Sequence, residues 1–364
     1  MEIFAAVCFA IACADLLFDD RLHLGTALKE GLGAITELLL LMCGFMALSP
    51  WIASHIAPAV TPFFRMLGCD PSLFAGIIFC CDAGGAYLAK QIAFDPQAAL
   101  YNGLIVASFF GAAMTGVVPL SLANTSGRKR EAAVRGLSIA FIALPFSCLV
   151  TGTFCRMPLL LMIKNTWPLL ILSLLLLCCL VYFTQKTVSF FSVLAILIRA
   201  AALTGFSIAI LQEAAGIVIL EGLTPLDEIY PVIVRIGVFL GGILPFFTVL
   251  QKALQRPLIR LSRRIGISLT GVSYLFLSTA NDIPTLLNLD IMDENSIMLN
   301  VAYAMITAYT VGDFLAFTLT FAPHLAIPMM LGRLLCGLLI IMICLCVIRK
   351  TPAHIDSNKA EQAG

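Results

Sequence analysis

The chain has 364 residues, of which 60% are hydrophobic and 12% are charged, and its mean hydropathy is +1.01. A soluble domain carries roughly a quarter charged residues, so the composition excludes an ordinary soluble fold. The net charge of +1 also gives no support for a nucleic-acid partner. Many apolar runs of about 20 residues instead predict an all-α, polytopic integral membrane protein whose immediate partner is the lipid bilayer.

Eleven apolar segments follow one another along the chain. They cover about residues 3–18, 34–56, 72–90, 98–123, 136–153, 167–184, 188–211, 232–249, 268–288, 296–322 and 324–348. No basic stretch precedes the first segment, which is therefore expected to be a retained helix and not a cleaved signal. The last residues, 349–364, form a short polar tail whose composition predicts disorder.

The distribution of Lys and Arg between the segments favours nine spans. If all eleven segments cross the bilayer, the two faces hold 11 and 8 of the basic loop residues. If segments 72–90 and 268–288 each enter and leave on one face, the counts become 15 and 4. Because Lys and Arg concentrate on the cytoplasmic side, we expect nine spanning helices plus two re-entrant or broken helical segments. Eleven full spans remain the alternative.

The two exceptional segments each carry a carboxylate and helix-weakening residues at their centres. Residues 80–85 read Cys-Cys-Asp-Ala-Gly-Gly, and residues 280–284 read Ala-Asn-Asp-Ile-Pro. A carboxylate is costly inside a bilayer and glycine weakens a helix, so neither suits a plain span. Five predicted spans separate the two segments, which therefore enter from opposite faces, as in inverted-repeat transporters.

The residues that follow each interrupted segment also indicate a repeat. An asparagine occurs early in the next apolar run (Asn102, Asn300) and a glycine midway along it (Gly111, Gly312). We therefore expect one transport domain over residues 1–348, with repeats at about 34–153 and 232–348. Irregular backbone at membrane depth must be covered by protein or line a water-filled cavity, so two corresponding breaks predict a substrate site.

Carboxylates, amides and glycines near the breaks are the candidate substrate-binding residues. Ionisable residues in the membrane usually serve a substrate or an ion, although a protonated carboxyl can also cap a half-helix. The amides either bond a hydroxyl group or bridge helices, and the glycines form the break. The set is Asp82, Gly84, Gly85, Asn102, Asn281, Asp282, Asn300 and Asp313. Arg333 either pairs with Asp313 or snorkels at a helix end.

A site with two or three carboxylates and no firmly placed cation selects a small cation. A neutral substrate would leave the carboxylates unpaired, and an anion would be repelled. Ser278, Thr279 and Asn281 near one tip suit a hydroxyl group, so the residues predict a transporter for a small cationic or amino-alcohol solute. No cofactor, catalytic group or metal site is predicted, because the 13 cysteines lie mostly in apolar runs and the four histidines are scattered.

Several stretches, in order, resemble the ethanolamine utilisation permease family. They are residues 68–76, 81–85, 88–90, 101–105, 280–284, 300–304 and 312–317, so the likeness covers about 60–125 and 240–345. The resemblance implies uptake of ethanolamine across a bacterial inner membrane, feeding an ammonia-lyase pathway in a microcompartment. Relatives more often carry Asn at the position of Asp282, so the resemblance implies that Asp282 is not essential and that Asp82 and Asp313 are the safer pair to assign to the substrate.

The same residues also fit three other functions. An intramembrane aspartyl protease would use Asp82 and Asp313, and Gly312-Asp313 matches half of its signature, but Thr310 stands where that signature has glycine. A cation-coupled transporter for another small amine is a second alternative. A structural membrane anchor is a third, although it would have no use for central carboxylates. The sequence leaves a homo-oligomer open.

Overall fold

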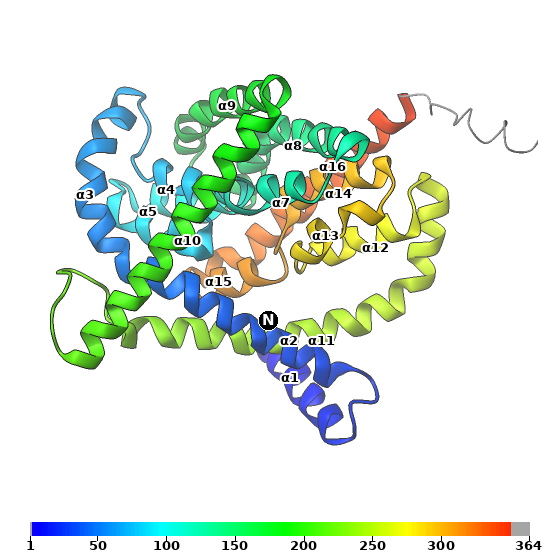
Figure 1. The fold of residues 1–364 in the computed structure, drawn as a ribbon, viewed down its shortest axis with the longest axis horizontal. Helices are drawn as coiled ribbons and strands as arrows, with labels where there is room; N and C mark the ends of the chain where they lie inside the picture. The colour runs from blue at the N-terminus through cyan, green and yellow to red at the C-terminus, as the bar shows by residue number, and fades with distance from the viewer. Residues whose placement is uncertain (1, 351–364) are drawn as a thin grey trace, which may run out of the picture.

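The computed structural model describes residues 2–350 of the chain, and within that range every regular element is helical (Figure 1). Seven stretches of these residues are long and apolar enough to cross a membrane: Leu39–Met66, Pro96–Ala123, Gly127–Phe154, Leu159–Tyr182, Thr184–Ala215, Leu226–Leu254 and Pro323–Lys350. The prediction of an all-α, polytopic membrane protein is confirmed. Residues 351–364, most of the predicted polar tail, lie outside the described residues.

Sixteen α-helices follow one another without an intervening strand in the described range. They are α1 Glu2–Leu17, α2 Leu24–Leu38, α3 Gly44–Met66, α4 Leu73–Ile78, α5 Ala86–Ile92, α6 Pro96–Leu100, α7 Val118–Ala123, α8 Gly127–Phe154, α9 Leu159–Tyr182, α10 Thr184–Ala215, α11 Leu226–Ile265, α12 Leu269–Ser278, α13 Ile283–Leu287, α14 Glu294–Thr307, α15 Asp313–Phe321 and α16 Pro323–Lys350. Wider π-helical turns continue α2 into α3 and α6 into α7.

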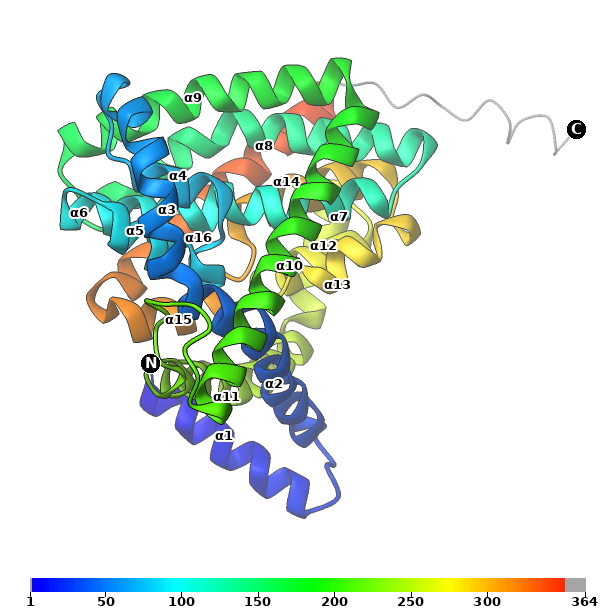
Figure 2. The ribbon, with the colours of Figure 1, turned by 60° about the vertical axis from the view of Figure 1, so that its left-hand side comes forward.

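The α6–α7 stretch, Pro96–Ala123, lies at the centre of the molecule. In its most apolar window 83% of residues are buried, against 17% in α10. Figure 2 shows α8 and α9 running along one side of the fold and α1 and α11 along the other, with α10 leading from α9 toward the start of α11. Apolar side chains that cover the surface of α9 and α10 are those expected of helices facing lipid.

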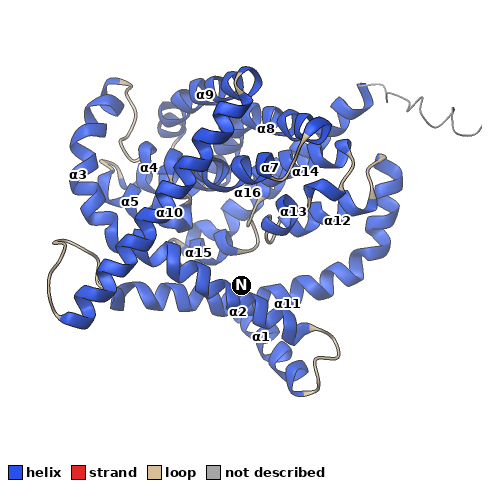
Figure 3. Ribbon diagram, viewed as in Figure 1, coloured by secondary structure: helices blue, strands red, loops and turns tan. Residues whose placement is uncertain are grey.

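One expected helix is not continuous. Residues 296–322 were expected to form one apolar run, but α14 ends at Thr307 and α15 begins at Asp313. Between them Tyr309 adopts a φ of 56°, in the left-handed region that bulky residues rarely adopt. The second half of the chain therefore contains two breaks, and the expectation of a single helix here is wrong. In Figure 3, α15 follows a loop and does not continue α14 directly.

Helices α4 and α5 form a hairpin whose two ends meet. The Asp70 carboxylate, just before α4, accepts hydrogen bonds from the backbone N–H of Phe94 at 3.0 Å and of Asp95 at 3.3 Å, just after α5. The Arg65 guanidinium stacks on the Phe94 ring, 4.5 Å from its centroid. A carboxylate that accepts several backbone N–H bonds fixes both chain ends at one point, so the segment returns to where it began.

Helices α12 and α13 form a second hairpin of the same kind. Ser268 caps α12 by accepting from the Gly271 N–H, and its hydroxyl lies 2.9 Å from that of Ser296 in α14. Across the break, the Ser278 hydroxyl donates to Thr285 at 2.9 Å, and the Thr285 hydroxyl donates to the Tyr274 carbonyl at 3.1 Å. These bonds satisfy groups that the interruption leaves without helical partners.

In each half of the chain, a glycine allows the residues that follow a hairpin to pack closely against the interrupted backbone of that hairpin. A Cβ added at Gly111 would lie 2.0 Å from the Phe79 carbonyl oxygen, and one added at Gly312 would lie 2.1 Å from that of Ala280. The N–H of Val311 also donates to the Thr279 carbonyl at 3.0 Å. Only glycine permits contacts this close.

The packing at Gly111 gives a stability prediction. Gly111→Ala should destabilise the fold by about 1–3 kcal/mol, because its methyl group would meet a carbonyl that cannot move freely. Gly116→Ala is the matched control in the same stretch, since a Cβ there would meet nothing within 4 Å. Thermal unfolding of the detergent-purified proteins should show a lower midpoint for the first variant only. Equal midpoints would contradict the contact.

Candidate functional site

The break between α4 and α5 depends on two glycines. Phe79 and Cys80 are extended, Ala83 lies at φ −87° and ψ 44°, and Gly84 has a φ of 91°. A Cβ at Gly84 would lie 2.5 Å from the Phe45 Cβ, and one at Gly85 would lie 2.7 Å from the Cys80 carbonyl oxygen. Side chains are thus excluded at both positions, and Gly84 also needs a left-handed backbone.

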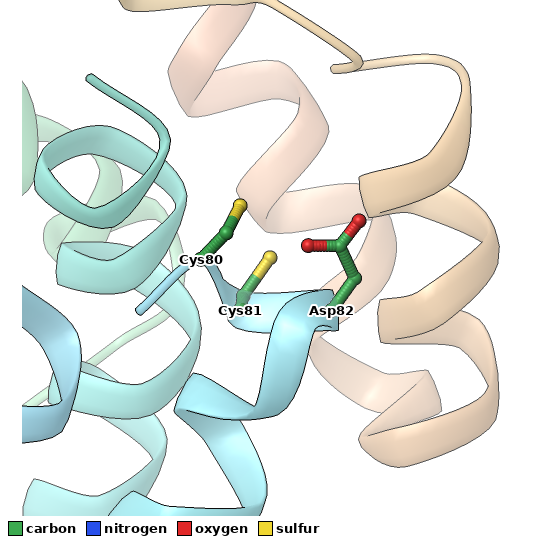
Figure 4. Close-up of side chains that lie close together, drawn as sticks. All are labelled: Cys80, Cys81 and Asp82. Carbon is green, nitrogen blue, oxygen red and sulfur yellow. The ribbon is translucent and has the colours of Figure 1, made fainter. Parts of the chain in front are cut away.

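This break turns Asp82 toward the second half of the chain. Residues Cys81–Gly85 pack against α15, and Figure 4 shows the Asp82 carboxylate on the same side of the break as the Cys80 and Cys81 thiols. Asp82 and Asp313, the first residue of α15, are both half-buried. The carboxylates of Asp82 and Asp282 lie within electrostatic range of the Asp313 carboxylate. Three acidic groups that are far apart in sequence therefore share one region.

Asp282 occupies the N-cap position of α13, but its carboxylate makes no capping bond. The neighbouring Asn281 side chain accepts from the Ile283 N–H at 3.0 Å and so performs the capping. Asp282 is 2% exposed, and its carboxylate lies beside the phenol of Tyr309. The cap that was one alternative for Asp282 thus belongs to Asn281, and the Asp282 carboxylate lies within electrostatic range of Asp313.

Tyr309 is a member of this cluster that the sequence reading missed. Its phenol lies within electrostatic range of all three carboxylates, and its ring packs 5.3 Å from that of Phe314. The left-handed backbone at Tyr309 directs the side chain there, and such strain is often found at functional positions. The only sequence signal was Gly312, three residues later, which marks the end of the break.

Arg333 of α16 is fully buried and holds the α14–α15 break. Its guanidinium donates to the Ala308 carbonyl and the Thr310 hydroxyl, both at 3.0 Å. It also donates to the Ser108 carbonyl at 2.9 Å and hydroxyl at 2.7 Å. Neither sequence alternative is correct, because the side chain is 1% exposed and these hydrogen bonds go to neutral groups. The guanidinium also lies over the rings of Phe109 and Phe314, at 4.5 and 5.2 Å.

Asn102 and Asn300 are placed away from the carboxylates, at the far ends of the hairpins. The Asn102 amide donates to the Ser72 hydroxyl at 2.9 Å and to Asn165 of α9 at 3.1 Å. The Asn300 amide donates to the carbonyls of Gly271 and Ser296. Gly271 lies seven residues, about 10 Å, before the end of α12. Of the two roles expected for these amides, the structure shows helix bridging.

The site as a whole is acidic. The Tyr309 phenol lies within electrostatic range of all three carboxylates. The Arg333 guanidinium donates its hydrogen bonds to neutral acceptors and lies within electrostatic range of Asp282. Three carboxylates near one guanidinium favour an additional small cation, because buried like charges that outnumber their counter-ions are unfavourable. A hydroxyl group on the same solute would find the Tyr309 phenol as a partner.

Comparison with known proteins shows which family the chain is part of. The profile of a family described as "Ethanolamine utilisation protein, EutH" matches residues 1–347. The chain belongs to the EutH family. EutH relatives are distant: "Probable ethanolamine permease EutH" of Listeria monocytogenes is 28% identical over 336 residues, which covers 92% of this chain and 90% of the relative. No solved structure matches the chain significantly.

Other relatives extend the comparison across bacteria. "Probable ethanolamine permease EutH" of Salmonella typhimurium is 27% identical over 361 residues, with 93% of this chain and 88% of the relative covered. The "Uncharacterized protein YxeR" of Bacillus subtilis is 27% identical over 343 residues, with 93% of each chain covered. The chain is thus a multi-pass membrane protein homologous to bacterial EutH proteins over nearly its full length.

The buried position of Arg333 in this EutH protein gives a second prediction. Arg333→Gln should lower stability by several kcal/mol, since each buried acceptor left without a donor costs about 1–3 kcal/mol. Arg349→Gln on the same helix is the control, because Arg349 is exposed. Monodisperse yield and thermal midpoint in detergent should fall for the first variant alone. A stable Arg333→Gln protein would show that the α14–α15 break is held by other contacts.

Proposed function

We propose that this chain is an ethanolamine permease of the bacterial cell membrane, and that it binds the ammonium group of ethanolamine between Asp82 and Asp313. The observation that supports this most is the meeting of Asp82, Asp282 and Asp313 from separate broken segments. The names of the EutH relatives agree with that substrate. Ethanolamine carries one ammonium and one hydroxyl group, which match an acidic site with a phenol beside it.

The three carboxylates and the Tyr309 phenol have different proposed roles in binding the solute. Asp82 and Asp313 are half-buried, so their carboxylates are the ones that an incoming ammonium reaches. Asp282 is almost fully buried behind them and, with Tyr309, faces the hydroxyl end of the solute. Gly84 and Gly85 shape the turn that carries Asp82. Asn102, Asn281 and Asn300 act as supports that hold helix ends.

We also propose an inverted repeat within a single transport domain, residues 1–348, with repeats at about 34–153 and 232–348. Five of the seven candidate spans lie between the two hairpins, an odd number, so the hairpins would enter from opposite faces. The close contacts of Gly111 and Gly312 with the preceding breaks correspond to each other. So do two N-caps, Asp95 and Asp293, each seven residues before an asparagine.

The proposed nine spans follow from the same arrangement. They comprise the seven candidate spans, the shorter apolar helix α1, and the interrupted pair α14–α15. The hairpins α4–α5 and α12–α13 are then re-entrant. Their joined ends support this, because a segment whose ends are hydrogen-bonded to each other returns to the face it came from.

The remaining alternatives are distinguished by experiment. Asp82 lies within electrostatic range of Asp313, and a protease would also need two neighbouring aspartates, but the relatives carry the name of a probable permease. A membrane anchor would have no use for three converging carboxylates. A cation-coupled transporter of another small amine would show uptake that prefers that amine and depends on an ion gradient.

Uptake measurements test the substrate site. In proteoliposomes, Asp82→Asn and Asp313→Asn should each reduce uptake of labelled ethanolamine at low concentration about tenfold or more, because a hydrogen bond to a charged group contributes about 1.5–3 kcal/mol. Asp227→Asn is the control, since Asp227 is exposed at the start of α11. Wild-type uptake should be inhibited by excess propylamine more than by ethylene glycol. Absence of wild-type uptake would favour the protease or anchor.

Cysteine labelling tests the hairpin topology. Single cysteines replacing Arg65 and Lys90, both exposed, should react with a membrane-impermeant maleimide from the outer face in a reduced-cysteine background. Arg128→Cys, at the exposed start of α8, should be protected in intact cells and react after permeabilisation. If Arg65→Cys and Lys90→Cys label from opposite faces, the first hairpin crosses the membrane and the inverted repeat is excluded.

A further inference from the structure

The break that carries Asp82 also brings together two thiols that substrate binding does not use. The Sγ atoms of Cys80 and Cys81 and a carboxylate oxygen of Asp82 all lie within 4.8 Å of one another. In an α-helix, consecutive side chains point about 100° apart. Here the extended backbone at Cys80 precedes the turn, so the three side chains emerge on one side, as Figure 4 shows.

We propose that Cys80, Cys81 and Asp82 form a binding site for a thiophilic divalent cation such as Zn²⁺ or Cd²⁺. Two sulfur ligands and one carboxylate suit these ions, and three protein ligands leave a fourth position open to water. Ligand atoms around one tetrahedral ion are about 4 Å apart, so small side-chain rotations complete the site. Among residues 2–350, this is the one such group of three His, Cys, Asp or Glu side chains.

The charge balance favours such an ion at a buried position. Cys80 is 8% exposed and Cys81 is 0% exposed. When a divalent ion binds, each thiol releases its proton to water and the sulfur forms a bond to the metal. Two positive charges replace two protons, so the net charge of the three residues stays the same. The site therefore accepts the ion without adding charge to the low-dielectric interior.

The consequence for transport rests on the proposed function. A metal that occupies the Asp82 carboxylate removes one of the two groups assigned to the ammonium. Zn²⁺ or Cd²⁺ should therefore inhibit ethanolamine uptake, and ethanolamine should compete with the metal.

Binding is tested first, without ethanolamine. Titration of the purified full chain with Cd²⁺ should produce a saturable ultraviolet thiolate-to-cadmium band of one equivalent, reversed by a chelator, with two protons released per ion. The band should disappear in Cys80→Ser/Cys81→Ser and persist in the control Cys43→Ser/Cys148→Ser, whose cysteines are also buried. Asp82→Asn should weaken binding by at least about tenfold.

A wild-type protein without the band, or the same band in Cys80→Ser/Cys81→Ser, would overturn the proposal. If the double variant does not fold, the Cd²⁺ titration is made on the single variants Cys80→Ser and Cys81→Ser. Together with the number of protons that the wild type releases, it then tests the metal site. In proteoliposomes, Cd²⁺ should inhibit wild-type uptake, and the uptake that remains in the double variant should be insensitive to it. A band without any ethanolamine uptake would contradict the proposed function and leave the metal site intact.

Discussion

The centre of the fold depends on the hydrogen bonds that the buried Arg333 guanidinium donates. A helix that breaks inside a membrane leaves backbone carbonyls without donors, and neither lipid nor distant water can supply them. Arg333 donates to Ala308 and Thr310 at the α14–α15 break and to Ser108 in the central α6–α7 stretch. One side chain thereby joins the second half of the chain to the first. Its hydrogen bonds go to neutral groups, and its charge acts on the nearby Asp282 carboxylate.

The hairpins depend on a different constraint, the closure of their ends. Asp70 fastens the chain before α4 to the chain after α5, and Ser268 does the same for α12 and α14. With their ends fixed, the short half-helices can direct their broken tips inward. The glycines at 111 and 312 then allow the next stretch to lie directly against each broken backbone. Carboxylates reach the centre because the backbone that carries them is not helical there.

The sequence predicted the first two breaks because polar and helix-weakening residues interrupt long apolar runs. It missed the third, at residues 308–312, where no proline or glycine pair occurs and Gly312 alone is a weak signal. Tyr309 was missed for the same reason, since its position follows from an unusual backbone dihedral that no side-chain pattern encodes. For Asn102 and Asn300 the sequence left hydroxyl binding and helix bridging open, and the structure shows amide bonds to neighbouring helices. Arg333 was assigned an acidic partner or a surface position that it does not have.

By itself the sequence determined the class of protein: an all-α membrane chain with carboxylates at the centres of interrupted segments, of a kind that fits a small cation. These properties are local, because hydropathy over about 20 residues and a charge within it can be read without knowing what lies opposite. Only the tertiary structure decided which groups meet. Asp82 and Asp313 are separated by five candidate spans and a second hairpin, and their proximity depends on packing contacts such as Arg333 with Ser108, which no single segment specifies.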